Sequence, residues 1–531
     1  HFHMDFHTAY RITKASSIFT THTPVPAGNE AFNINRMDKY FHSYYYNLGL
    51  SKEEFMNLGQ QEEYNENTSF SMTVLGLKLT SYHNGVSKLH GEVSRTMWHR
   101  LWNNFPEDEV PIGHITNGIH TMTWVAREFS DLFDRYLSPR WKTEPDNQEI
   151  WNKVDIIPSE ELWREKQRRR VRLVLFAREY LKKRKKGFLA PEQVNNINEY
   201  LDPDALTIGF ARRFATYKRA LLLFTDMDRL SSILKNAEKP VQLLIAGKAH
   251  PHDVAGKEVI QTIIQRVREY GLERHVVFLE DYDMVIARYM VKGCDLWLNN
   301  PIRPMEASGT SGMKAALNGT LNLSILDGWW DEAFNGENGF VIGNGEEYIN
   351  SGEQDIVEAG TLYDAFEQII IPMFYERSSS HRFPDRWTQY MKNNIKTIAG
   401  QFSSSRMLKE YTENYYLNAL RNNQKYIENN AEKTRHFKEW CDRVRNEWNN
   451  AEIIDVKVSD NGENFLGKPI EVKVKVELGG LQPSDVVVQV YYGSVDHHGH
   501  LQNTKTEDLT LKHSHEYTHE YEGSYLNNDT G

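Results

Sequence analysis

Short apolar runs alternate with helical patterns in the middle of the chain. From residue 205 onward, runs rich in β-branched and large apolar residues occupy 206–210, 241–246, 276–279, 295–298, 321–326 and 339–342. The segments between them have the apolar spacing of helices, near 217–235, 255–270, 283–292 and 309–318. This alternation predicts an α/β fold with a doubly wound parallel sheet, in which ligands lie at the carboxyl ends of the strands.

The regions on either side have other patterns. Residues 1–100 predict helices and loops, with a strand at 17–20 and an apolar helical face over 86–101. A long helix rich in Lys and Arg begins near residue 160, and we interpret its charges as a solvated face. Residues 400–450 predict polar helices. From residue 451, apolar and polar positions alternate, which predicts an antiparallel β domain.

Composition excludes several classes of protein. The 531 residues carry 62 Lys and Arg against 73 Asp and Glu, and a net charge of −11 argues against a nucleic-acid-binding chain. No apolar run is long enough to span a membrane, and no signal peptide pattern is visible. The two cysteines, Cys294 and Cys441, cannot form a disulfide framework or a cysteine-rich zinc site. We expect a cytoplasmic, multidomain protein without a metal site.

Basic residues gather after the first predicted strand, in GFARRFATYKR at 209–219. The strand is expected to end at Phe210 and a helix to begin near Ala215. The following side chains then cluster at a strand end: Arg212, Arg213, Lys218 and Arg219. Fixed positive charge beside a helix N-terminus predicts an anion site, and the alternative is a basic surface cluster.

Small residues follow the strand at 295–298. Ser308, Gly309, Thr310 and Gly312 leave backbone N–H groups accessible, and the next helix carries Lys314 in its first turns. This pattern suits a phosphate cradle, with a lysine able to bond a carbonyl cofactor. The alternative is a Gly-Ser turn with an ordinary exposed lysine, which the residues alone favour for Lys314. Neither a G-x-G-x-x-G nor a Walker pattern is present.

A third group of residues lies in segments bounded by Pro or Gly. These segments surround His22, Asn84, Asn117 and Trp124. His and Asn side chains in such loops suit hydrogen bonding to sugar hydroxyls. The alternative is a structural role, which is the more common one for a lone His.

With these motifs the chain resembles the α-glucan (glycogen, starch, maltodextrin) phosphorylase family, in particular its bacterial and archaeal branch. EASGTSGMKAALNG at 306–319 resembles the family's pyridoxal-phosphate lysine motif, and RRFATYKR at 212–219 its phosphate-site motif. Five further segments also resemble family motifs and occur in the family's order along the chain: FTTHTPVPAG, HNGVSKLHGE, TNGIHTMTW, IAGKAHP and LDGWWDEAF. The similarity covers about 15–500.

The resemblance implies a PLP-dependent, retaining phosphorolysis of terminal α-1,4-linked glucosyl units to α-glucose 1-phosphate. Lys314 would carry pyridoxal 5′-phosphate, and the other cofactor contacts would be Arg212, Thr310, Ser311, Trp124 and Tyr282. The substrate phosphate would bind Arg213 and Lys218. The glucosyl unit would meet Glu306, Ser308, Gly309, Asn117, Tyr217 and, at its 6-hydroxyl, His22. After Tyr282 the chain has Asp283, where animal members place an Arg, and we interpret this as a subfamily difference.

The resemblance also implies the GT-B architecture of two Rossmann-like domains. Residues 1–125 would end the first domain, 126–400 would form the second, 401–450 would be a helical return segment and 451–531 a β-sandwich-like domain. Family members carry several hundred residues before the segment that matches 19–28. We therefore expect the first domain and the last strands to be truncated, and residues 1–531 alone to be a poor catalyst. The expected partners are α-1,4-glucan and inorganic phosphate, and a homodimer is compatible with the family.

Two other functions remain open at this stage. One is a nucleotide-sugar-dependent glycogen or starch synthase, but such enzymes commonly place a second Glu where Lys314 follows Glu306. The other is a noncatalytic glucan-binding relative. The complete set of Arg213, Lys218, Glu306 and Lys314 argues against lost catalysis at those positions.

Overall fold

The computed structural model describes residues 4–188, 190–378, 382–459, 467–495 and 501–526. They belong to two compact units, one of residues 14–421 and one that joins residues 1–13 to 422–531. In the second unit, Arg11 of α1 (Phe6–Ser16) lies 3.6 Å from the Asp442 carboxylate and over the ring of Phe437. The two ends of the chain therefore share one unit.

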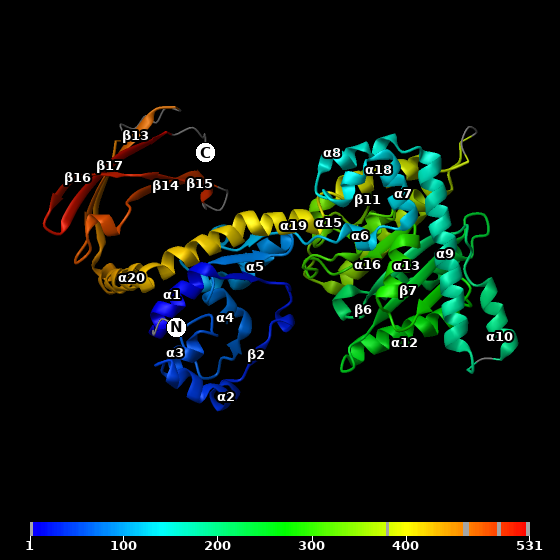
Figure 1. Ribbon diagram of the computed structural model, residues 1–531, viewed down its shortest axis with the longest axis horizontal. Helices are drawn as coiled ribbons and strands as arrows, with labels where there is room; N and C mark the ends of the chain where they lie inside the picture. Colours follow the sequence, from blue (N-terminus) through cyan, green and yellow to red (C-terminus); the bar gives the residue numbers. More distant parts are fainter. Residues whose placement is uncertain (1–3, 189, 379–381, 460–466, 496–500, 527–531) are drawn as a thin grey trace. The chain divides into compact units, whose positions relative to one another are not determined.

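A six-stranded parallel sheet forms the centre of the 14–421 unit (Figure 1). Its strands, in spatial order, are β11 (Gly339–Ile342), β10 (Leu321–Ile325), β9 (Leu296–Asn299), β6 (Leu206–Arg213), β7 (Val241–Lys248) and β8 (Val276–Leu279). All neighbouring strands pair in parallel, which confirms the six predicted strands and the doubly wound sheet. Strand order reverses between β6 and β9, and such switch points are where doubly wound sheets bind ligands.

The strands read as continuous apolar runs because helices cover both faces of the sheet. All residues of β9 and β10 are buried, as are all but the last residue of β6 and of β7. The connecting helices are α11 (Met227–Leu234), α12 (Val254–Glu269), α13 (Met284–Gly293), α14 (Ser311–Ala316) and α15 (Trp329–Ala333).

The helix predicted to begin near Ala215 is not formed. The chain after β6 makes a 3-10 turn at Thr216–Lys218 and another at Leu222–Phe224, and regular helix begins only with α11. Arg219 has a left-handed backbone (φ 43°) that ends the first turn, a conformation that interrupts a right-handed helix. The anion-site argument therefore rests on the side chains and not on a helix N-terminus.

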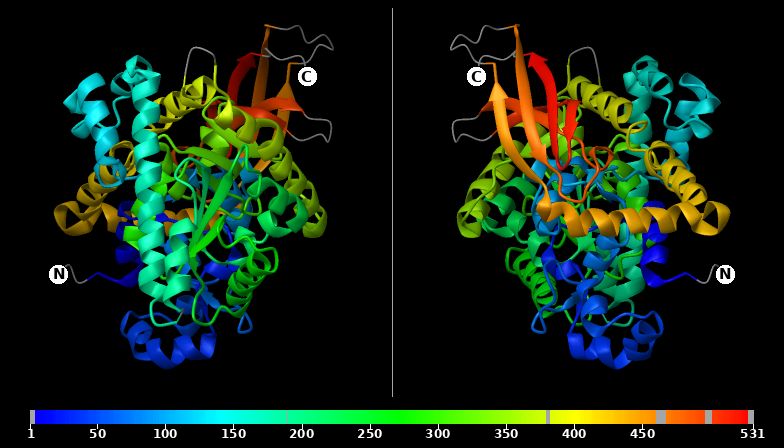
Figure 2. Two further views of the ribbon diagram at one scale, coloured as in Figure 1. Left: turned by 90° about the vertical axis from the view of Figure 1, so that its right-hand side faces the viewer. Right: turned by 90° about the vertical axis from the view of Figure 1, so that its left-hand side faces the viewer.

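The long basic helix is α9 (Ser159–Lys185), and Figure 2 shows it running alongside the sheet. The expected solvated face is wrong for four of its fifteen charged residues, which are buried: Glu165, Lys166, Arg169 and Arg170. Lys166 is completely buried and donates to Thr320 Oγ1 at 2.6 Å, and the buried Arg170 pairs with Asp295 at 2.8 Å. Buried charges are tolerated where they are paired and hydrogen-bonded, so part of the charge run is internal structure.

The first part of the 14–421 unit contains a second parallel sheet, of β1 (Ile18–Thr20), β4 (Tyr82–Gly85) and β5 (Gly113–His114). Its helices are α2 (Ile34–Asn47), α3 (Lys52–Asn57), α4 (Met72–Lys78) and α5 (Lys88–Trp98), with a short antiparallel pair, β2 (Ala31–Phe32) and β3 (Phe70–Ser71). The strand near 17–20 and the helix within 86–101 were both predicted and are confirmed.

Further helices surround these sheets. They are α6 (Thr121–Trp124), α7 (Arg127–Tyr136), α8 (Gln148–Trp151), α10 (Pro191–Asn196), α16 (Ser351–Asp364), α17 (Ile371–Tyr375), α18 (Asp385–Ile398) and α19 (Ser404–Tyr411). The segment of α19 contacts the three-stranded sheet of β1, β4 and β5. Asn84 Nδ2 of β4 donates to the Tyr411 hydroxyl at 2.8 Å. Ser403, directly before α19, forms a parallel bridge with Ile119.

In the second unit, α20 (Leu417–Glu447) is interrupted at Glu428–Ala431 and precedes the predicted antiparallel β domain. Four strands pair in the order β12 (Glu452–Val458), β13 (Pro469–Glu477), β17 (Thr518–Leu526) and β16 (Thr510–His515), and β14 (Gln489–Val495) pairs with β15 (Leu501–Asp508). Every second residue of β13 is buried, as its alternating pattern predicted. The antiparallel arrangement is confirmed.

Within the described ranges, no helix combines the length and apolarity needed to cross a membrane. The same residues contain no group of three or more His, Cys, Asp or Glu side chains placed to hold a metal ion.

Close packing of α9 on α13 depends on Gly293. A Cβ at this position would lie 2.5 Å from Leu173 Cβ, and 2.9 Å from the Arg169 carbonyl oxygen. We expect Gly293→Ala to destabilise the 14–421 unit by about 1–3 kcal/mol, because the helices must separate. The check is the transition temperature in differential scanning calorimetry. Gly360→Ala in α16 is the matched control, since open space surrounds that helical glycine, and equal effects of the two changes would contradict the argument.

Candidate active site

The carboxyl ends of β6 and β9 bring an ion-paired cluster together at the switch point. Arg212, the penultimate residue of β6, donates to the Glu306 carboxylate, which lies in the loop after β9. Lys218 Nζ lies 3.4 Å from the same Glu306 oxygen. Arg212 and Glu306 are only 7% and 8% exposed. The predicted clustering of Arg212 and Lys218 is therefore present, with Glu306 between them.

Arg219, also predicted in the anion site, serves instead as an anchor. Its buried guanidinium donates to the backbone carbonyls of Asn300 and Pro301 at 3.1 and 2.7 Å, and pairs with Asp355 and Glu358. These contacts tie the turn that carries Lys218 to the loop after β9. The sequence-based assignment of Arg219 to anion binding is wrong because its donors are already used.

Burial and neighbouring charges both shift the pKa values of the cluster. Burial lowers the pKa of Lys218 to about 8, and the neighbouring charge of Arg212 acts in the same direction. For Glu306, burial acts to raise the pKa, but the charges of Arg212 and Lys218 outweigh it and hold the pKa below its ordinary value. Burial raises the pKa of Tyr217, and the charge of Glu306 acts in the same direction. The carboxylate thus stays ionised, while Lys218 loses its charge near pH 8.

Asp327, at the end of β10, fixes the backbone of the Glu306 loop. Its carboxylate accepts from the Glu306 amide at 2.9 Å and from the Gly328 amide at 2.8 Å. Gly328 has φ 57°, and any side chain there would collide with the Ser308 carbonyl, which accepts from the Trp329 amide at 2.9 Å. Burial raises the pKa of Asp327 to about 8. Ser308 is buried, and Gly309 has φ 72°.

Lys314 projects from α14 beside Trp124. Its Nζ lies 4.4 Å from the centre of the indole ring, and burial lowers its pKa. No ion pair to Lys314 is found among the described residues, so its amine is not neutralised by a carboxylate there. Thr310 occupies the N-cap position of α14, and the Ser311 hydroxyl accepts from Trp297 Nε1 at 3.0 Å. An amine with a lowered pKa in an apolar setting has the properties of a carbonyl-reactive lysine.

Two features of this edge suit a bound phosphate. Arg212 Nη1 is buried and has no hydrogen-bond partner within the described part of the chain. Gly312 lies so close to Asn322 and Trp329 that a side chain would not fit. An unsatisfied buried guanidinium N–H costs free energy, and an anion would relieve that cost.

The first part of the unit reaches the same edge through hydrogen bonds. The Ser87 hydroxyl donates to the Ala307 carbonyl at 2.6 Å, and Thr116 donates to Glu332 at 2.6 Å. The Asn117 amide donates to the Val86 carbonyl at 3.0 Å, so Asn117 lies in the loop beside these contacts. Asn117 is half-buried.

Other predicted residues are less closely connected. Within the described residues, no hydrogen bond, ion pair or ring contact joins His22 or Tyr282 to Glu306 or Lys314. Arg213 is exposed at the end of β6. Asn84 is fully buried and bonded to Tyr411, so the suggested sugar contact is wrong for Asn84. Asp283, the residue after Tyr282, accepts from the amides of Val285 and Ile286 as the N-cap of α13.

Sequence reasoning missed the residues that position the site. Asp327, Ser87 and Glu332 hold loops by hydrogen bonds to groups that include ones far away in the sequence: the Glu306 amide, the Ala307 carbonyl and the Thr116 hydroxyl. One signal was available for Asp327, because it follows a buried strand adjacent to β9, where a carboxylate is unexpected without a role.

Comparison with known proteins agrees with this arrangement. The family model "Carbohydrate phosphorylase" matches residues 1–371, and "Glycogen phosphorylase C-terminal domain" matches residues 448–531. The chain belongs to the carbohydrate phosphorylase family.

Three curated relatives give the extent of the similarity. The chain is 41% identical to a maltodextrin phosphorylase of Thermococcus litoralis over 99% of its own length and 60% of the relative's. It is 38% identical to a glycogen phosphorylase of Mycobacterium tuberculosis, over 93% and 57%, and 40% identical to one of Aquifex aeolicus, over 76% and 58%. Its matches thus span less than two thirds of the length of these three relatives.

We expect Asp327→Ala to destabilise the Glu306 loop, because the buried amides of Glu306 and Gly328 lose their acceptor. Each unsatisfied buried donor costs about 1–3 kcal/mol. The check is thermal unfolding, together with hydrogen exchange at the amide of Glu306. Asp327→Asn is the matched control, since its amide oxygen still accepts one bond, and it should lose less stability. Equal stability of the Ala variant and the parent would contradict the role given to Asp327.

Proposed function

We propose that the natural protein carrying this sequence is an α-1,4-glucan phosphorylase, which transfers terminal glucosyl units to phosphate with retention of configuration. The observation that carries the proposal is the junction at the switch point. There Arg212 and Lys218 converge on Glu306, and the same loop leads into the helix that bears Lys314. Family membership supports the reaction, and the cations and the carboxylate supply its chemistry.

The proposed architecture is GT-B, with residues 1–125 in the first Rossmann-like domain and 126–400 in the second. Support comes from the two parallel sheets, one in each range. Residues 401–450 would be the return segment, consistent with the bond between Tyr411 and Asn84, and 451–531 the β domain.

The basic residues would hold phosphate groups close together. Two unit negative charges 4 Å apart repel by about 4 kcal/mol at an effective dielectric constant of 20. Arg212, Arg213 and Lys218 supply positive charge from one strand end and its turn. The unpartnered Arg212 Nη1 offers a donor that Glu306 does not use.

Pyridoxal 5′-phosphate fits the residues of this edge. Lys314 would bond its carbonyl carbon, Trp124 and Tyr282 would line the ring, and its phosphate would meet Arg212, Thr310 and the Ser311 amide. When bound, the cofactor would supply a phosphate with a second pKa of about 6, suited to proton transfer near neutral pH. Lys314 contributes an amine whose pKa burial has lowered, and Trp124 contributes an apolar wall.

Glu306 would exchange its partners when substrates bind. Without ligands, its carboxylate is occupied by Arg212 and Lys218. Phosphate would attract both cations and free the carboxylate oxygens to accept from glucosyl hydroxyls. Ser308, Gly309, Asn117 and Tyr217 would complete the sugar contacts, and His22 would meet the 6-hydroxyl. Binding of phosphate and of glucan would therefore be mutually favourable.

The reaction is tested by incubating the natural protein with maltodextrin and phosphate, without a nucleotide sugar. We expect release of glucose 1-phosphate, with a loss of at least a thousandfold in kcat for Lys314→Ala. Incorporation of glucose from a nucleotide sugar, without phosphorolysis, would favour a synthase instead. Glucan binding without either reaction would identify a noncatalytic relative.

The cofactor is tested on the same preparation independently of activity. Borohydride reduction followed by peptide mapping should place a pyridoxyl group on Lys314. Lys292→Ala, which removes another half-buried lysine, is the control and should leave the label unchanged. A label on another lysine, or no label on a natural protein that carries out phosphorolysis, would overturn the cofactor assignment.

Phosphate binding should depend on the protonation of Lys218. Because burial lowers its pKa to about 8, the ammonium is lost as pH rises through 8, well below the range of an ordinary lysine. We expect the Kd for phosphate to rise by about tenfold per pH unit above pH 8, measured by isothermal titration calorimetry. Lys218→Arg keeps its charge and should give a nearly constant Kd from pH 7 to 9. The same pH profile in both proteins would contradict the assignment.

A further inference from the structure

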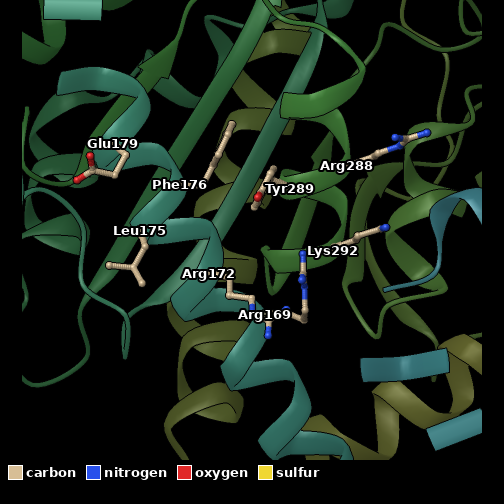
Figure 3. Close-up of a pocket in the computed structure, with 8 residues that line it drawn as sticks. All are labelled: Arg169, Arg172, Leu175, Phe176, Glu179, Arg288, Tyr289 and Lys292. Carbon is tan, nitrogen blue, oxygen red and sulfur yellow. The ribbon is translucent and has the colours of Figure 1, made fainter. Parts of the chain in front are cut away.

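A pocket lies between α9 and α13, outside the cluster around Glu306 (Figure 3). Its volume is about 480 Å³. Four cationic side chains line it, two from each helix: Arg169 and Arg172 of α9, and Arg288 and Lys292 of α13. The basic run of α9 that was interpreted as a solvated face thus contributes to a pocket.

The helix packing makes the rest of the pocket aromatic. Because Gly293 approaches Leu173, the two helices lie close, and further along Phe176 and Tyr289 stack with ring centres 3.9 Å apart and planes 4° apart. Arg172, Phe176 and Glu179 have helical spacings of four and three residues, so they share one face of α9. The pocket therefore has a cationic end and an aromatic side.

The positive charges are poorly compensated. Arg172 pairs with Glu128, and Arg169 lies 3.5 Å from the same carboxylate. Among the described residues, neither Arg288 nor Lys292 forms an ion pair. Glu179 also lines the pocket, but it pairs with Lys182 at 2.6 Å. Of the four cations, only Arg169 and Arg172 are therefore paired with a carboxylate of the described residues, and they share the same one.

One of these cations is buried with a free donor. Arg169 is 8% exposed, and its Nε has no hydrogen-bond partner within the described residues. Burial lowers the pKa of Lys292, and the charges of Arg169 and Arg288 act in the same direction. Other buried charges of α9 differ, since Lys166 donates to Asn318 and Thr320, and Arg170 donates to Pro203 and Asp295. The unpartnered donor and the like-charge crowding would both be relieved by an anion.

We propose that this pocket is a second ligand site, which binds a phosphate monoester with a planar apolar body. A phosphate monoester brings nearly two negative charges and three acceptor oxygens, which suits several cations better than one carboxylate would. Its body would lie along Phe176 and Tyr289. Arg172 and Glu179 are seven residues apart, about 10 Å along the helix, so the pocket has room for a body beyond the phosphate. The site is independent of the reaction proposed above.

The test uses phenyl phosphate as the probe and isothermal titration calorimetry on the natural protein. We expect saturable binding, weakened at least tenfold by Arg288→Glu, an exposed position, and by Lys292→Gln. Lys153→Glu changes an exposed lysine outside the pocket and should have no effect. Arg213→Ala, in the proposed active site, should also leave this binding unchanged. Transition temperatures check that each variant is folded.

Tyr289→Ala tests the body of the ligand. The parent should bind phenyl phosphate more tightly than inorganic phosphate, and the variant should lose this preference while still binding inorganic phosphate. Binding abolished by Arg213→Ala but retained in Arg288→Glu would assign the probe to the active site and overturn the proposal. An absence of saturable binding, or a preference unchanged by Tyr289→Ala, would also overturn it.

Discussion

The ion-paired carboxylate of Glu306 is the constraint on which the site depends. Arg212 and Lys218 would repel one another at the end of β6, and a single buried anion from the neighbouring strand's loop holds them together. Removal of one partner from such a buried cluster leaves a charge without compensation. The stability lost in this way is much larger than the net stability that the intact cluster contributes. The surrounding structure serves this pairing: Arg219 anchors one loop, and Asp327 fixes the other.

The sheet could be predicted from the sequence because its signal is local. Buried parallel strands appear as short apolar runs, and all six runs in 205–342 became strands. The antiparallel domain could also be predicted from the sequence, since apolar and polar residues alternate along the whole length of β13. The turn after β6 could not be predicted in this way. Arg219, which has a left-handed backbone there, is held by carbonyls near Asn300, far away in the sequence.

The charges of α9 show a second limit of sequence reasoning. Composition does not distinguish a solvated lysine from Lys166, which is completely buried. Its burial depends on a hydrogen bond to Thr320, which is far away in the sequence. The motifs of the site were found early by resemblance, whereas the residues alone favoured an ordinary turn around Lys314. What the structure adds is Trp124 beside that amine and an unsatisfied donor on Arg212.

The joining of residues 1–13 to the last part of the chain has a consequence for biosynthesis. Arg11 leaves the ribosome long before Asp442 and Phe437, its neighbours in the finished unit. Helix α1 must therefore wait, without these partners, while the whole 14–421 unit is made. Domains generally fold as units during synthesis, so the intervening unit can reach its own structure first. Helix α1 then packs against α20 only after that unit has been made.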